Sequence, residues 1–282
     1  MSKKFLGVLT RCRDEYFIRE FCDYYISQGV DGIHIYDDNS LDKTIYNEIK
    51  HHPQVHIEYS KDITVENKFD HLVPMFEKLY EWLIYIDVDE FITTKKNSSR
   101  TIRDELETTF AAASCVKVPW VMMTGGDLEI NPRSLLKEIV WRWNHDEKHP
   151  SDVHKFRCRY DKIECKSIFK PNYFTSISSL GGIDHVPIGY KNKKDWSLIR
   201  ESVYNETSNL DPWYHNLREK DIETGYMLCY HYRIISKENC YSKVKTNNWY
   251  GANNSERFQL QLANALLESS YPEIQDITLQ NK

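Results

Sequence analysis

The sequence predicts an α/β protein: a single Rossmann-like domain with a mainly parallel central sheet and a helical C-terminal extension. Three observations lead to this prediction. Short apolar runs alternate with segments of helical spacing through the first hundred of its 282 residues. Polar side chains directly follow three of those apolar runs, and the end of the chain reads as helix. Strands that alternate with helices form parallel βαβ units with right-handed crossovers.

The first hundred residues are regular. Apolar residues recur at helical spacing over 16–28, and Gly29 ends that helix. Ser40 or Asp42 can cap a short helix that reaches residue 50. Pro74 marks a boundary or a kink in the helix predicted over 66–82. The strands predicted around these helices cover 5–12, 32–37, 55–60 and 83–88.

The remainder of the chain is less regular. Helices are predicted at 101–110 and 134–143, and two more near 237–246 and 255–267. The predicted strands lie at 114–123, within 164–174 and at 226–235. No repeat or linker divides the chain. We therefore expect one domain over 1–235 and a helical extension over 236–282.

The composition is that of an acidic, aromatic-rich globular chain. Its net charge is −5 and its pI is near 6.1, which argues against a protein whose main task is to bind nucleic acid. Seven Cys residues form no CxxC pair, which indicates reduced, buried thiols and not disulfides or a zinc site. The N-terminal apolar run is too short for a signal peptide, and no stretch approaches a membrane span. We expect a soluble, cytoplasmic protein.

An apolar run leads directly into three acids in the stretch "LIYIDVDEF", residues 83–91. Without a counter-charge, repulsion between Asp87 and Asp89 would raise the pKa of one of them. A divalent cation removes this conflict. Mg²⁺ and Mn²⁺ prefer oxygen ligands and are often held by one or two carboxylates together with substrate phosphates. The stretch therefore predicts a site for a metal ion and a diphosphate, with solvated loop acids as the alternative.

Two other predicted strands also end in polar residues. Thr10 and Arg11 close the first strand, and Asp37 and Asp38 close the second. In parallel sheets, ligands bind beyond the carboxyl ends of the strands, and these ends share one edge. We expect the polar residues to lie on the same rim as the acids after the fourth strand.

Five segments of the chain, in order from about Arg13 to Val244, resemble successive blocks of glycosyltransferase family 92 and its bacterial and large-DNA-virus relatives. They read "RDEYFIREFCDYYISQGVDGIHIYDDNSLD", "WLIYIDVDEF", "KSIFKP", "DHVP" and "CYHYRIISKENCYSKV". The resemblance implies a GT-A fold. It also implies a metal-dependent, inverting transferase of the hexosyl or deoxyhexosyl class. The donor would be a nucleotide sugar, first of all a UDP-sugar, and the acceptor a glycan or another hydroxyl compound.

The resemblance also implies roles for single residues. Asp87 and Asp89 match the family's metal-binding motif and would bridge Mn²⁺ or Mg²⁺ to the donor diphosphate. His231 matches a late family histidine and would be a third metal ligand, with a packed histidine as an equal alternative. Lys166 would neutralise the leaving diphosphate. Its alternative is a partly exposed lysine on a strand.

The nucleoside of the donor would lie at the ends of the first two strands, as in GT-A enzymes. The residues there are Thr10, Arg11, Asp37 and Asp38. A carboxylate in this position could accept a hydrogen bond from a base N–H or a ribose hydroxyl. Arg11 could equally form a salt bridge at the edge of the sheet.

Inversion requires a base within reach of the acceptor hydroxyl. Asp184 in "GGIDHVP", with His185 beside it, is the first candidate, and Asp127 in "TGGDLE" is the second. An ordinary loop acid is the alternative for each. The loop around 178–195 could close over the donor and exclude water. Several aromatic residues could line an acceptor groove or simply pack: Trp120, Tyr173, Trp196, Trp213 and Tyr214.

The resemblance assigns 1–100 to a nucleotide-binding half and 101–235 to an acceptor half. Animal members carry a membrane anchor, so the lack of one favours a bacterial or viral type, acting in the host cytoplasm if viral. Two other classes stay open. A metal-dependent phosphohydrolase or nuclease would release phosphate or nucleotides from model esters without a sugar acceptor. A non-catalytic binding module would hold a nucleotide sugar and never turn it over.

Overall fold

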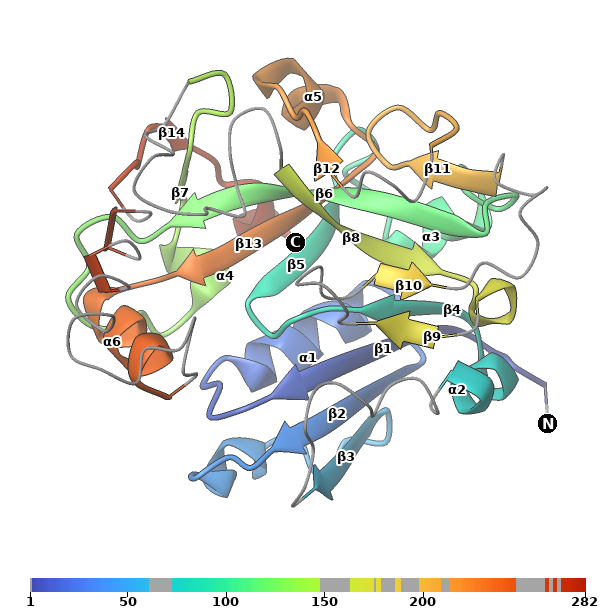
Figure 1. Ribbon diagram of the computed structural model, residues 1–282, viewed down its shortest axis with the longest axis horizontal. Coiled ribbons are helices and arrows are strands. Elements are labelled where there is room, and N and C mark those ends of the chain that lie inside the picture. Colours follow the sequence, from blue (N-terminus) through green and yellow to red (C-terminus); the bar gives the residue numbers. More distant parts are fainter. Residues whose placement is uncertain are drawn as a thin grey trace.

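The protein is an α/β structure with one curled central sheet and helices packed around it (Figure 1). It is seen in a computed structural model. The described residues are 2–60, 73–147, 163–174, 176–178, 186–188, 198–208, 214–246, 262–263, 266–267 and 270–282.

The N-terminal half of the sheet is parallel, as predicted. Its strands are β1 (Lys4–Cys12), β2 (Gly32–Asp38), β3 (Val55–Ser60) and β4 (Tyr80–Tyr85), in the spatial order β3-β2-β1-β4. All three pairings in this group are parallel. This order is that of a Rossmann-like half. The chain leaves β1 toward β2 on one side, and β4 lies on the other. The carboxyl ends of the adjacent strands β1 and β4 therefore form the switch point at which such sheets bind ligands.

Helix α1 (Ile18–Ser27) connects β1 to β2 and buries one face against the sheet. Two tyrosines on that face reach strand β5 (Glu90–Thr94). The Tyr24 hydroxyl donates to the Ile92 carbonyl at 2.8 Å, and the Tyr25 hydroxyl donates to the Glu90 carbonyl at 3.0 Å. These bonds fix the start of β5, and with it the acidic turn before it, against the first helix.

Beyond β4 the sheet becomes mixed. β8 (Ile163–Phe169) lies antiparallel between β4 and β6 (Cys115–Thr124). β13 (Met227–Ile234) is parallel to β6 and antiparallel to β5. The predicted mainly parallel sheet thus holds for the first four strands, while the second half brings antiparallel neighbours to the same edge. This mixture lets residues from distant parts of the chain meet beside the end of β4.

The other described elements are short. They are η1 (Lys43–Tyr46), α2 (Val73–Leu79), α3 (Ile102–Glu107), α4 (Leu135–Glu138), β7 (Trp141–Arg142), η2 (Pro171–Tyr173), β9 (Ser176–Ser178), β10 (Val186–Ile188), β11 (Ile199–Glu201), β12 (Tyr214–His215), α5 (Glu219–Thr224), α6 (Lys237–Thr246), β14 (Ile274–Gln275) and η5 (Thr278–Asn281). As predicted, Asp42 caps η1 by accepting from the Thr44 amide at 2.9 Å.

Three segments differ from the sequence prediction. The helix predicted over 134–143 ends at Glu138, because β7 follows and pairs with β6 and β14. The fourth strand ends at Tyr85, before the acids. The last residues include helix α6, as predicted, but also β14 and η5, which pack back on the sheet. Hydrogen bonds from the Lys282 ammonium to residues 94, 98 and 100 join the chain end to the region after β5.

Two glycines in the sheet are required by a close approach. A Cβ at Gly7 would lie 2.8 Å from the Tyr80 ring, and one at Gly32 would lie 2.1 Å from the Tyr80 hydroxyl. Tyr80 begins β4 and lies across β1 and β2, whose neighbouring positions are Gly7 and Gly32 in register. The glycines therefore let β4 dock closely against β1, which sets the position of the acids that follow β4.

The described part of the chain contains no helix that is both long and apolar enough to cross a membrane. Six of the cysteines lie within it, and all six are buried free thiols, as predicted: Cys12, Cys22, Cys115, Cys165, Cys229 and Cys240.

Candidate active site

The acids of the stretch 83–91 form the turn that joins β4 to β5, at the carboxyl edge of the parallel strands. The arrowheads of β1, β2 and β13 point toward this side of the molecule, where α6 also lies (Figure 1). Asp87 and Asp89 lie in the turn itself, and Glu90 is the first residue of β5. The Asp87 amide donates to Glu90 Oε2 at 3.1 Å, which closes the turn. We call these three residues the acid cluster.

Asp87 and Glu90 share one buried lysine. Lys166 on β8 places its Nζ 3.1 Å from Asp87 Oδ2 and 3.2 Å from Glu90 Oε2. The antiparallel pairing of β8 with β4 carries this lysine to the cluster. Burial opposes the positive charge, but Asp87 and Glu90 outweigh it and raise the pKa of Lys166. Lys166 is thus a buried cation, and the partly exposed alternative is wrong.

Asp89 is held by a second lysine, from the C-terminal helix α6. The Lys243 ammonium donates to Asp89 Oδ2 and, at 2.9 Å, to the carbonyl oxygen of Arg233. Both side chains are nearly buried. Burial opposes the charge of Lys243 as well, but Asp89 and Glu15 raise its pKa. Asp89 and Lys243 therefore form a buried ion pair that links the turn after β4 to α6.

His231 lies opposite Glu90, because β13 pairs antiparallel with β5 in that register. Its Nε2 is 3.8 Å from Asp89 Oδ1 and 3.8 Å from Glu90 Oε1. The imidazole packs against the Trp120 ring, with centroids 4.3 Å apart. Burial lowers the pKa of His231 well below its ordinary value, and Lys166 acts in the same direction. His231 is therefore a neutral histidine, both packed and part of the cluster.

Glu15, in the loop after β1, lies close enough to the cluster for the charges of Lys243, Asp89 and Asp87 to act on it. Burial raises the pKa of Glu15 to about 7, although the positive charge of Lys243 acts to lower it. The charges of Asp89 and Asp87 contribute to the same rise. Burial likewise raises the pKa of Glu90 well above its ordinary value, more than Lys166 lowers it.

The turn "DVDE" is therefore tolerated because two ammonium groups accompany it. Lys166 pairs with Asp87 and Lys243 pairs with Asp89, while the raised pKa values of Glu15 and Glu90 favour their neutral forms. Buried charges are stable when they are paired in this way. The two lysines balance the two aspartates, so the described site is close to neutral overall.

Whether these side chains suit a divalent ion depends on which of their oxygen and nitrogen atoms are available as ligands. The Asp87 side chain keeps 42% of its surface exposed, and Glu90 Oε1 and His231 Nδ1 have no hydrogen-bond partner. However, no group of three or more His, Cys, Asp or Glu side chains within the described ranges is arranged to hold a metal ion. Oδ2 of each aspartate is also bonded to a lysine. This geometry fits an ion that takes its other ligands from a bound diphosphate.

The residues predicted for the nucleoside are held by one another and by neighbouring side chains. Thr10 is fully buried within β1. Arg11 forms a salt bridge to Asp38, with Nε 2.8 Å from Oδ2, which is the alternative considered from the sequence. Asp37 is buried and accepts from the Tyr46 hydroxyl at 2.8 Å. Arg11, Asp37 and Asp38 do end on the predicted rim, with Arg11 and Asp38 as one ion pair.

The candidate bases are not joined to the cluster. Asp184 and His185 lie outside the described residues, as do Trp196, Trp213 and most of the loop around 178–195. Asp127 is exposed in the loop after β6, where its charge helps to raise the pKa of Lys237 at the start of α6. No hydrogen bond or ion pair among the described residues connects Asp127 to the acid cluster. Of the other aromatics, Trp120 is buried in the site.

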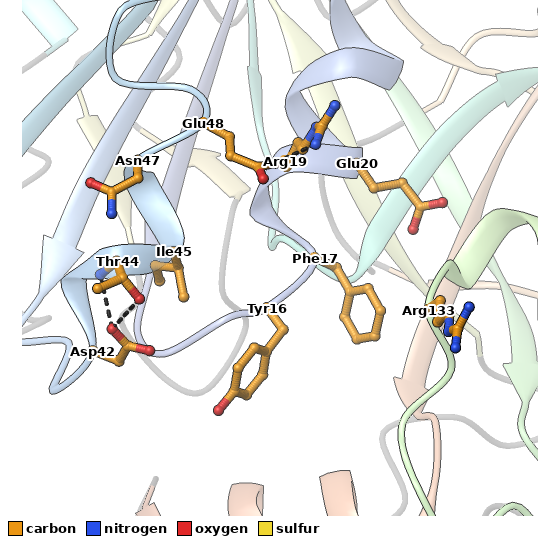
Figure 2. A pocket seen from close by; sticks show the side chains of 10 residues that line it. All are labelled: Tyr16, Phe17, Arg19, Glu20, Asp42, Thr44, Ile45, Asn47, Glu48 and Arg133. Atoms are coloured by element: carbon orange, nitrogen blue, oxygen red, sulfur yellow. Dashed lines mark hydrogen bonds and ion pairs between the residues drawn. The ribbon is translucent and has the colours of Figure 1, made fainter.

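A polar hollow of about 500 Å³ lies beside the loop that carries Glu15. Figure 2 shows the rings of Tyr16 and Phe17 between η1 on one side and Arg133 on the other. The Tyr16 side chain is 69% exposed. Helical spacing in the sequence placed Tyr16 in the first helix, but α1 begins at Ile18, so this aromatic lies in a loop and faces the hollow.

The structure brings together four predicted residues, Asp87, Asp89, Lys166 and His231, and adds three that sequence reasoning missed: Glu15, Glu90 and Lys243. Glu90 is adjacent to the motif, but the sequence pattern assigns it no role of its own. Lys243 lies in the quoted segment "CYHYRIISKENCYSKV", but one basic residue on a polar helix carries no signal of its own. Only the packing of α6 places it there. Gly125 permits this packing, since a Cβ there would lie 1.7 Å from the Ile235 carbonyl oxygen.

No family model matches the chain, and no curated protein matches it. Among solved structures, S. aureus TarS 1-349 is 10% identical at a TM-score of 0.37, over 93% of this chain and 71% of that one. TarS 1-349 in complex with UDP-GlcNAc is 10% identical at a TM-score of 0.36, over 93% of this chain and 72% of that one. The 4-diphosphocytidyl-2C-methyl-D-erythritol synthase from Anaerococcus prevotii is 11% identical at a TM-score of 0.35, over 78% of this chain and 95% of that one. These TM-scores are too low to support a functional conclusion.

Proposed function

We propose that this chain is a glycosyltransferase that moves a sugar from a nucleoside-diphosphate sugar, first of all a UDP-sugar, to a hydroxyl acceptor. The observation that carries the proposal is the acid cluster at the switch point between β1 and β4, flanked by Lys166 and Lys243. Ligands of such sheets bind at this point. A site with both carboxylates and ammonium groups suits a phosphate-bearing ligand that arrives with a cation.

The metal belongs to this proposal as a partner of the donor. Asp87 and Asp89 would hold Mg²⁺ or Mn²⁺, with His231 as the nearby imidazole, and phosphate oxygens would complete the ligand set. The metal would supply charge neutralisation for the diphosphate as it leaves. Because the lysines already balance the two aspartates, the protein alone is expected to bind the ion weakly. Ion and nucleotide are expected to bind together.

In the transfer, the acceptor oxygen attacks the anomeric carbon and the bond from that carbon to the diphosphate oxygen breaks. The proton of the acceptor goes to a base, and negative charge develops on the leaving diphosphate. The buried ammonium of Lys166, fixed by Asp87 and Glu90, would stabilise that charge without reorganisation. We retain Asp184 as the first candidate base and Asp127 as the second. A single displacement of this kind inverts the anomeric configuration.

At the other end of the donor, the ribose or base would meet the rim formed by Arg11, Asp37 and Asp38. A nucleoside hydroxyl or N–H would then share the Asp38 carboxylate with Arg11, in place of water. This part of the proposal rests on position at the carboxyl edge of β1 and β2.

The test is a thermal-shift screen of nucleotide sugars with and without Mn²⁺, followed by product analysis. A ligand that binds the native state raises the melting temperature in proportion to RT ln(1 + [L]/Kd). We expect stabilisation by one nucleotide-sugar class, larger with Mn²⁺, and then transfer of its sugar with an inverted anomeric centre by NMR. Release of phosphate from simple esters would favour a hydrolase, and binding without turnover would favour a binding module. No stabilisation by any donor would refute the proposal.

A further inference from the structure

Lys243 occupies an unusual position for a lysine on a polar helix. Its side chain is 8% exposed, and its ammonium reaches across 154 residues of sequence to Asp89. An ammonium group has three N–H donors. Two are directed at Asp89 Oδ2 and the Arg233 carbonyl, and among the described residues no contact accounts for the third.

The turn that this ammonium contacts is partly open to solvent and carries a second cation. Asp87, two residues before Asp89 in the turn, has a side chain that is 42% exposed, so a ligand can reach the turn at Asp87. Lys166 supplies a second ammonium to the same turn. The two lysines come from β8 and α6, and their ammonium groups contact aspartates that are two residues apart in the sequence. A diphosphate has oxygens spaced to meet more than one such cation.

The pair with Asp89 alone would not require a lysine from a separate helix. Burying an ion pair is expensive, and an apolar pair of similar volume is often at least as stable. The arrangement is better explained if the ammonium also serves a ligand, for which a mobile four-carbon stem and a compact charge are suited.

We propose that Lys243 binds a phosphate oxygen of the donor's diphosphate through its remaining N–H, so that α6 contributes directly to the donor site. This inference rests on the proposed function and names a residue that carries it. Lys243 then joins the diphosphate to Asp89, and Lys166 contacts Asp87 in the same turn.

The experiment compares three variants. Lys243→Met removes the charge, Lys243→Arg keeps it, and Lys237→Met is the matched control, an exposed lysine at the start of the same helix that pairs with Glu129. Wild-type protein is first titrated by calorimetry with UDP, GDP, CDP and ADP, in Mn²⁺ and in EDTA. The nucleoside diphosphate that binds is then titrated into each variant. Binding of the corresponding nucleoside to each variant is measured separately by ligand-observed NMR.

For Lys243→Met we expect affinity for the nucleoside diphosphate to fall by about 10- to 100-fold, in Mn²⁺ and in EDTA alike, with affinity for the nucleoside unchanged. Lys243→Arg should recover part of the loss, and Lys237→Met should match the wild type. A purely structural lysine would lower the melting temperature and leave the diphosphate affinity as it was. That result overturns the phosphate contact and leaves the proposed function intact.

Two further outcomes are decisive. If the wild type binds none of the four diphosphates, the proposed function fails together with this contact. If Lys243→Met does not fold, a crystal structure of the wild type with the bound nucleoside diphosphate tests the contact between Lys243 and the phosphate. A Lys243 Nζ within hydrogen-bond distance of a phosphate oxygen supports the contact, and an ammonium that remains on Asp89 and the Arg233 carbonyl alone refutes it.

Discussion

Two buried charge networks in this molecule have opposite characters. In one, Arg142 on β7 donates to both oxygens of Glu219 at 2.8 and 2.7 Å and to Asp276 at 3.0 Å. Asp276 also accepts from the Tyr230 hydroxyl at 3.0 Å. None of these side-chain atoms lacks a partner. We call this the Arg142 network.

The acid cluster, together with the adjacent His231, is incomplete by the same measure. Glu90 Oε1 and His231 Nδ1 are buried without a hydrogen-bond partner, and Asp87 remains partly exposed. Buried polar groups are normally satisfied, and exceptions concentrate where a ligand or a reaction completes them. The Arg142 network therefore joins elements of the fold, whereas the acid cluster is arranged to bind a ligand. Four predictions test this contrast.

The largest effect on stability is expected from Arg142→Met. The change removes the cation of the partly buried Glu219 and leaves the buried Asp276 with Lys95 alone, at 3.8 Å. Breaking a buried pair costs about 3–5 kcal/mol. Urea denaturation followed by circular dichroism measures the loss. Affinity of the folded variant for a nucleoside diphosphate should match that of the wild type. A loss of less than about 1 kcal/mol would show that the Arg142 network is not structural.

Asp87→Asn should have the opposite profile. We expect kcat/KM for sugar transfer, or for slow donor hydrolysis when no acceptor is known, to fall by about 10²-fold or more, because one anionic ligand of the donor site is lost. The melting temperature should fall less than in Arg142→Met, since the Asp87 side chain is 42% exposed and Glu90 remains beside Lys166. Asp23→Asn, an exposed acid on α1, is the control. Normal activity in Asp87→Asn would contradict the assignment of this turn to the donor.

The pH dependence of stability should distinguish a carboxyl group beside the acid cluster from a fully paired carboxylate elsewhere in the molecule. Burial raises the pKa of Glu15 to about 7, so the folded protein binds a proton that the unfolded chain has released above about pH 4.5. The contribution of Glu15 to the free energy of unfolding is therefore full at low pH. It falls as the pH rises toward 7 and then levels off. The difference in unfolding free energy between wild type and Glu15→Gln should decline from pH 5 to pH 7.

Glu201 provides the matching control for that experiment. The pKa of Glu201 is lowered to about 2; burial acts to raise it, but hydrogen bonds from His215 and Ser208 and the charge of Lys117 outweigh burial. Its contribution is present at neutral pH and is lost as the pH falls below about 4.5 toward 2. In a His215→Gln background, which removes the ionisable partner of Glu201, the difference made by Glu201→Gln should stay flat between pH 5 and 7. A slope there, or none for Glu15→Gln, would contradict these assignments.

The smallest effect is expected from Arg19→Met. Arg19 pairs with Glu48 and Asp23 on the surface, and its side chain is 61% exposed. Exposed pairs contribute about 0–1 kcal/mol, because water and salt screen them. The unfolding free energy in urea should change by less than that, and added NaCl should remove the difference. A larger loss would mean that surface pairs rival the buried networks in this protein.

The sequence was sufficient to predict the elements whose signals are local. The parallel strands around β1 and β4, the cap at Asp42 and helix α6 follow from alternation, spacing and capping chemistry. The place of Asp87 and Asp89 at a strand end follows from the same pattern. These features depend on residues close together in the chain.

Features that depend on strand register were not predictable. His231 meets Glu90 only because β13 pairs antiparallel with β5, and β5 itself was not predicted. The segment 134–143 reads as an amphipathic helix, yet pairing with β6 and β14 turns its second half into β7. The pairing of the two aspartates with lysines was not predictable for the same reason, because only tertiary packing brings Lys166 and Lys243 to this turn.

The long span between Asp89 and Lys243 has a consequence for the protein during its synthesis. A chain growing on the ribosome contains the acidic turn long before it contains the helix that supplies the second ammonium, and closing so long a loop is slow and entropically unfavourable. Until then, Asp89 must keep its charge hydrated or find a transient partner. Donor binding should therefore appear only when translation has passed residue 243, which makes ligand capture a readout of completed folding.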